Sequence, residues 1–182
     1  LDTRLALEIE GFYVPPRALG VADSRGLICA NLERGPGERL KPEALGAYWI
    51  PHLWVLREHG VALFGPPPRA LIAPVTADDL RVAMRELLAG WATRLETEPV
   101  VLASSGYRCY AVLSLCRILY TLEQGDVISK AAAAEWATRR LDRDWAALIA
   151  QVVATRLEPG RPSAPARPRW RARSFGTSPR WP

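Results

Sequence analysis

Two cations on either side of one turn are the residues best suited to chemistry in this sequence. Arg117 lies in an apolar stretch with helical spacing, and Lys130 follows Ser129 after a turn that contains Gly125. The pattern predicts that Ser129 caps a second helix and that Lys130 opens it. A lysine there is disfavoured by the helix macrodipole unless an anion binds. These groups predict a phosphate or triphosphate site, and the alternative is a solvated lysine at a helix start.

Two carboxylates near the N-terminus share one face of a predicted strand. Apolar and other side chains alternate from residue 5 to residue 10, and Pro15 and Pro16 stop the pattern. A period of two is typical of a strand, so Glu8 and Glu10 point to the same side. The alternative to a functional carboxylate face is an ordinary solvated strand face. Residues 20–42, rich in glycine, are predicted to form a loop.

The rest of the body is predicted to be helical. Helices are expected over 42–60, kinked or divided at Pro51, over 107–124, from Ser129 to near 141, and from 142 or 144 to 157. Another begins at Thr76, whose pairing with Asp79 resembles a capping box. Its predicted buried stripe comprises Leu80, Met84, Leu87, Leu88, Trp91 and Leu95. Short links and repeated amphipathic stripes favour a mainly α protein built as a helical bundle, with residues 1–14 as its single strand.

Composition and charge bear on the order of the C-terminal segment, on the cellular compartment and on the partners of the chain. The chain has 182 residues and a formal net charge of +5, but the segment 156–182 holds seven Arg and one Glu, so the body is near neutral. That Pro/Arg-rich tail is predicted to be disordered and dispensable; the weaker alternative is a nucleic-acid arm in which Trp170 and Trp181 stack on bases.

Three cysteines without C-x-x-C spacing fit a reducing cytoplasm. No apolar run approaches the ~20 residues that span a bilayer, so no membrane partner is expected.

A family resemblance rests on the region around the two cations. The stretch from Tyr110 to Leu141 resembles the C-terminal helical domain of aminoglycoside nucleotidyltransferases, the group that includes streptomycin/spectinomycin 3″-adenylyltransferase. The matching residues are Leu115, Arg117, Tyr120, Gly125, Ser129-Lys130 and Trp136-Ala137. Upstream, residues 56–75 resemble the family's R-E-H-x-V-x-L-x-G-P segment. The resemblance covers roughly residues 5–155.

The resemblance implies a chemistry and a set of roles. The matching arginine and lysine contact the ATP phosphates in the family, so Arg117 and Lys130 are expected to bind ATP. The strand "IEGFYVP" matches the family strand that carries the general base for the acceptor hydroxyl. Glu10 is the best match for that catalytic carboxylate, and Glu8 is the alternative. ATP and Mg²⁺ are the implied cofactors, and an aminoglycoside-like small molecule is the implied acceptor, in keeping with antibiotic resistance.

Family members also carry G-S and D-x-D upstream of that strand, to grip phosphate and hold Mg²⁺. This sequence has no G-S pair, and its one D-x-D, Asp142-Arg143-Asp144, lies between two predicted helices and is expected to cap one of them. The chain is therefore expected to be a fragment, inactive alone, with no metal ligands of its own. The expected parts are a remnant of an α/β nucleotidyltransferase domain over 1–41, the helical bundle over 42–157 and the tail over 158–182. The alternative function is a non-catalytic helical interaction module, and the sequence leaves the oligomeric state open.

Overall fold

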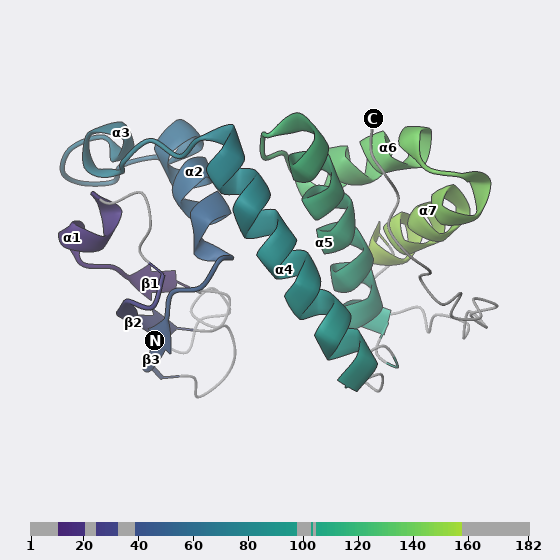
Figure 1. Cartoon of the computed structure of the whole chain (residues 1–182), viewed down its shortest axis with the longest axis horizontal. Coiled ribbons are helices and arrows are strands. Elements are labelled where there is room, and N and C mark those ends of the chain that lie inside the picture. The colour runs from purple at the N-terminus through teal and green to yellow at the C-terminus, as the bar shows by residue number, and fades with distance from the viewer. Residues whose placement is uncertain (1–10, 21–24, 33–38, 98–102, 104, 158–182) are drawn as a thin grey trace.

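The computed structural model describes residues 11–20, 25–32, 39–97, 103 and 105–157. The described part is mainly α-helical, as the sequence predicts, and it also contains one small sheet. The elements form an arch in which the sheet and the first three helices stand on one side and the last three on the other (Figure 1). The helices are α1 (Pro16–Leu19), α2 (Trp49–His59), α3 (Pro68–Leu71), α4 (Ala77–Thr97), α5 (Ser105–Gln124), α6 (Lys130–Arg140) and α7 (Arg143–Leu157).

The sheet corrects the prediction of a single strand. Three antiparallel strands lie in the order β1 (Gly11–Tyr13), β2 (Ile28–Leu32) and β3 (Lys41–Ala44). The prediction of a loop over 20–42 is therefore wrong for β2. The buried positions of β2 are Cys29 and Asn31, but the buried Asn31 is polar and the exposed Ile28 is apolar, so the hydropathy of the strand does not show the period of two that its burial has.

Two further predictions concern the ends of elements. Residues 1–10 of the predicted N-terminal strand, Glu8 and Glu10 among them, lie outside the described residues, and β1 is the described end of that pattern. β3 spans the predicted domain boundary at 41/42, so α2 begins at Trp49 rather than at residue 42. Pro51 does not divide α2, because it lies in the first turn, where its missing N–H has no intrahelical acceptor.

The link from α2 to α3 is a turn with exposed apolar residues. Val61, Leu63 and Phe64 are each more than four-fifths exposed, at 84%, 98% and 100%. Arg57 on α2 holds the end of this link, because its guanidinium donates hydrogen bonds to the carbonyl oxygen of Arg69 at 2.9 Å and to that of Ile72. Arg57 of the R-E-H segment thus connects α2 with α3 through hydrogen bonds.

Local signals place the starts of the long helices correctly. Thr76 and Asp79 form the predicted capping box: the Asp79 carboxylate accepts from the Thr76 N–H at 2.8 Å, and the Asp79 N–H donates to the Thr76 hydroxyl at 3.1 Å. Gly125 ends α5 with a φ of +70°. A Cβ on Gly125 would lie 2.7 Å from Cβ of Ala77, so the turn after α5 packs tightly on the start of α4.

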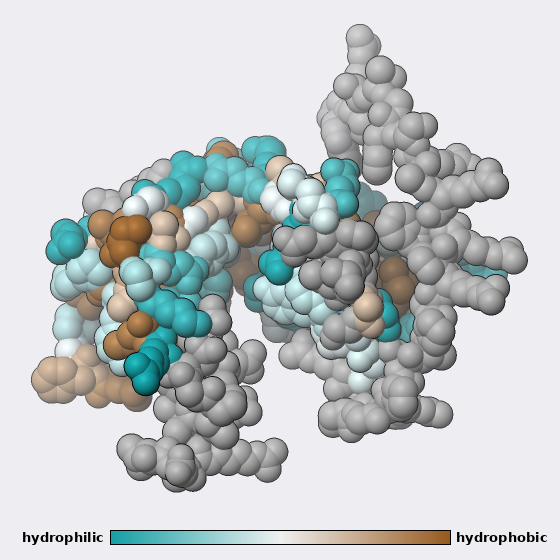
Figure 2. All heavy atoms as spheres, turned by 90° about the horizontal axis from the view of Figure 1, so that it is seen from below, coloured by the Kyte–Doolittle hydropathy of each residue, from teal (hydrophilic) through white to brown (hydrophobic). Residues whose placement is uncertain are grey.

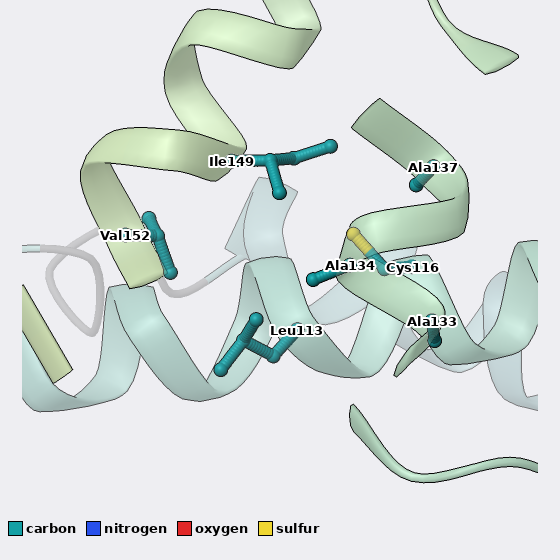
Figure 3. Close-up of a cluster of buried hydrophobic side chains, with 7 residues drawn as sticks. All are labelled: Leu113, Cys116, Ala133, Ala134, Ala137, Ile149 and Val152. Carbon is teal, nitrogen blue, oxygen red and sulfur yellow. The ribbon is translucent and has the colours of Figure 1, made fainter. Parts of the chain in front are cut away.

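The largest core cluster joins α5, α6 and α7. Its buried side chains are Leu113, Cys116, Ala133, Ala134, Ala137, Ile149 and Val152 (Figure 3). The three alanines let α6 approach α5 closely, and α6 crosses α5 steeply instead of lying antiparallel to it (Figure 3). An antiparallel pair is what the five-residue link alone predicts, so the packing of small side chains overrides the link length.

Cys116 gives this cluster a measurable pH dependence. Burial raises the pKa of its thiol from 9.0 to about 11. Below pH 9 the thiol is protonated in both states, whereas between pH 9 and about 11 only the unfolded state ionises, so the free energy of unfolding should fall by about 2 kcal/mol. Urea unfolding of the wild type and of Cys116→Ala across this range should show the steeper loss in the wild type only. Equal slopes for the two proteins would contradict this expectation.

Candidate functional site

Lys130 occupies the position that the sequence predicts. It is the first residue of α6, and the Ser129 hydroxyl accepts the N–H of Ala132 at 3.1 Å. The side chain is partly buried. Its ammonium lies 4.0 Å from the centroid of the Tyr110 ring on α5, a cation–π contact. The contact therefore joins the start of α6 to α5.

Arg117 lies two helical turns beyond Tyr110 on the same side of α5. Its side chain is partly buried. Burial lowers the pKa of the guanidinium from its usual value, and the electrostatic influence of Tyr110 opposes that shift. Within the described part of the chain, no hydrogen bond or ion pair involves this guanidinium. A partly desolvated cation in this state gains most from an anionic ligand.

Both cations interact with Tyr110. Lys130 contacts the ring of Tyr110, and Arg117 interacts with Tyr110 electrostatically. These contacts do not measure the separation of the two charged ends, so the shared phosphate site of Arg117 and Lys130 stays a prediction. The predicted position of Glu10, or of Glu8, opposite these cations falls outside the described residues and stays a prediction.

An open pocket of about 420 Å³ adjoins Tyr110. It lies between the two sides of the arch, where the surface is hollowed when seen from below (Figure 2). Ala47 and Tyr48 line it before α2, and the other lining residues come from α4 and α5: Glu86, Leu87, Gly90, Trp91, Arg94, Tyr107 and Tyr110.

Three aromatic rings form one wall of this pocket. The ring centroids of Trp91 and Tyr110 are 5.7 Å apart, and each lies 6.0 Å from the centroid of Tyr107. The Arg94 guanidinium lies 5.5 Å from the Tyr107 ring centroid. Glu86 brings the only carboxylate among the lining residues, and it pairs with Arg25 from the strand side of the arch. The wall is suited to stacking a ring, with charged groups at its edge.

The strand side of the pocket carries a hydrogen-bonded carboxylate. The Tyr48 hydroxyl donates to Glu43 at 2.7 Å, and the buried Asn31 amide donates to the other Glu43 oxygen at 2.5 Å. Burial, followed by this bond to Glu43, raises the pKa of Tyr48. The phenol therefore stays protonated and holds a fixed orientation at the pocket edge.

Sequence reasoning missed this pocket. It placed Trp91 in the buried stripe of α4, where Leu80 and Met84 are indeed buried, but Trp91 is only partly buried and Leu88 is 42% exposed. The available signal was the i, i+3 spacing of Tyr107 and Tyr110, which puts two aromatics on one face of α5.

No group of three or more His, Cys, Asp or Glu is close enough to hold a metal ion in the described part of the chain. Asp142 of the D-x-D sequence caps α7 as expected, because its carboxylate accepts the N–H of Trp145 at 3.2 Å. Each helix in the described part of the chain is too short or too polar to cross a membrane.

Comparison with known proteins decides the family. The family model described as the C-terminal domain of aminoglycoside adenylyltransferase matches residues 70–169. The chain belongs to this family. The match covers α4 to α7, and therefore Arg117, Lys130 and the aromatic wall. The resemblance that was inferred from the residues is confirmed for this adenylyltransferase domain.

Several curated adenylyltransferases are similar to the chain. An aminoglycoside (3'') (9) adenylyltransferase of Rhizobium radiobacter is 38% identical over 85 residues, which are 47% of this chain and 29% of the relative. One of the same name from Klebsiella pneumoniae is 36% identical over 93 residues, 51% of this chain and 33% of the relative. A spectinomycin 9-adenylyltransferase of Staphylococcus aureus is 27% identical over 93 residues, 51% of this chain and 32% of the relative. The chain spans about a third of the length of these relatives.

Proposed function

We propose that this chain is the part of an aminoglycoside adenylyltransferase that holds the ATP triphosphate from its helical side. Arg117 and Lys130 bind phosphate oxygens, and AMP passes from ATP to a hydroxyl of an aminoglycoside-like acceptor. The observation that carries the proposal is that Lys130 contacts the ring of Tyr110, which lines the pocket, while Arg117 lies two helical turns from Tyr110 on the same side of α5.

The two cations have complementary roles in this proposal. The Arg117 guanidinium is planar, so it can donate two parallel hydrogen bonds to one phosphate group. Lys130 adds a compact charge at the start of α6, where backbone N–H groups and the macrodipole also favour an anion. Together they would neutralise charge on the phosphates that leave as pyrophosphate.

The pocket is the proposed place of the acceptor. Its aromatic wall can stack the face of a sugar or cyclitol ring, and Glu86 with the Glu43–Tyr48 pair can accept or donate hydrogen bonds at the edge. The general base is proposed to be Glu10, or alternatively Glu8, just before β1. The described residues do not fit a Mg²⁺ site, so no step is assigned to the metal within this chain.

The remaining proposals concern the extent of the chain. The proposed division is a nucleotidyltransferase remnant over 1–41, the helical domain over 42–157 and a tail over 158–182. The chain is proposed to bind ATP but to transfer no AMP by itself, in a cytoplasmic enzyme. The competing function, a non-catalytic helical interaction module, predicts no ATP binding, so one titration separates the two.

Replacing Lys130 with alanine should weaken ATP binding by the whole chain. We expect a loss of about 1.5–3 kcal/mol, the scale of a hydrogen bond to a charged group. The matched control is Arg139→Ala, which removes an exposed cation at the other end of α6 that pairs with Glu135 at 3.1 Å. ATP titration followed by calorimetry, without metal, measures both affinities, and thermal unfolding checks the fold.

The control should bind ATP as the wild type does. If Lys130→Ala and Arg139→Ala lost affinity equally, general surface charge would explain the binding and the specific site would be refuted. If the wild-type chain bound no ATP, the interaction-module function would be favoured.

A further inference from the structure

We infer that Tyr110 is a positioning residue that holds the Lys130 ammonium in place for an anionic ligand. The inference rests on the proposed function, since it assigns a role in the same phosphate site. Neither the family match nor the names of the relatives gives this residue a role.

The physical argument begins with the unfavourable position of Lys130. At the first residue of α6 the ammonium lies near the positive end of the macrodipole, which drives a flexible lysine side chain outward into solvent. The negative face of the Tyr110 ring, 4.0 Å from Nζ, counteracts this. The ring therefore helps to keep the ammonium near α5.

The neighbouring aromatic rings hold the Tyr110 ring in a defined orientation. The residue is 52% exposed, but its ring is packed against Trp91 and Tyr107, with centroid distances of 5.7 and 6.0 Å. Tyr110 also lines the pocket, and Arg117 lies two helical turns further along the same side of α5. A ring held in this way gives Lys130 a defined position relative to the Arg117 guanidinium, so less side-chain entropy is lost when both bind one phosphate chain.

The test compares two substitutions of Tyr110 in the full chain, with inorganic tripolyphosphate as the probe. Tyr110→Phe keeps the ring and should bind tripolyphosphate within about twofold of the wild type, whereas Tyr110→Leu removes the ring and should bind about fivefold more weakly. In a Lys130→Ala background, Tyr110→Leu should cause no further loss, because the ring acts through the lysine.

A second readout does not depend on any ligand. In the free protein, the ring should shift the NMR signals of the Lys130 Cε protons upfield in the wild type and in Tyr110→Phe, and this shift should be lost in Tyr110→Leu. If the role of Tyr110 were purely structural, its substitution would change the melting temperature, and the Lys130 Cε proton shifts would not differ between Tyr110→Phe and Tyr110→Leu.

The possible failures are distinguishable. Unchanged affinity in Lys130→Ala would refute the proposed phosphate site itself. Unchanged affinity in Tyr110→Leu, an equal loss in Tyr110→Phe, or a further loss in the Lys130→Ala background would each overturn the role of the ring while leaving the phosphate site standing.

Discussion

Arg117→Met is expected to lower the affinity of the chain for ATP by about 3 kcal/mol, roughly a hundredfold, without lowering stability. The loss should be larger than for Lys130, because a guanidinium can donate two hydrogen bonds to one phosphate. Stability should not fall, because burial already disfavours this cation, as its lowered pKa shows. Methionine retains the length and apolar packing of the arginine stem.

Calorimetric titration with ATP measures the expected loss of affinity, and urea unfolding measures whether stability is retained. Arg117→Lys keeps the charge without the planar fork and should fall between wild type and Arg117→Met. Arg143→Met, at an exposed position in the first turn of α7, is the control for a change in total charge. Equal ATP affinity in Arg117→Met and Arg143→Met would remove Arg117 from the proposed site. A large drop in stability would instead assign the arginine a structural role.

Leu80→Ala is expected to destabilise the fold by about 3–4 kcal/mol. Leu80 is fully buried on α4, in a cluster with Ile50, Ala83 and Val127 that joins α2, α4 and the link before α6. The cavity cannot close easily, because three separate segments of the chain meet there. A loss of this size is a large part of the stability of an ordinary domain.

Leu88→Ala supplies the matched control for Leu80. It lies on the same helix and is 42% exposed, so its loss should stay below about 1 kcal/mol. Urea unfolding of both variants by circular dichroism gives the comparison. Similar losses for the two would contradict the expectation that the cavity left at Leu80 cannot close.

The sequence alone determined the features that depend on near neighbours in the chain. The capping box at Thr76, the cap at Ser129 and the stop at Gly125 involve groups within a few residues of one another, so their patterns could be read directly. The mainly α fold and the family followed from the same local patterns and from the motif around Arg117 and Lys130.

The tertiary structure alone decided the features that join distant segments. β2 pairs with β1 and β3 on either side, whereas the apolar and polar residues of its own sequence do not alternate. The pocket combines residues from positions 47 to 110, and Lys130 at the start of α6 meets Tyr110 on α5, twenty positions earlier in the chain. Such contacts depend on how side-chain volumes fit between elements, which local spacing does not encode.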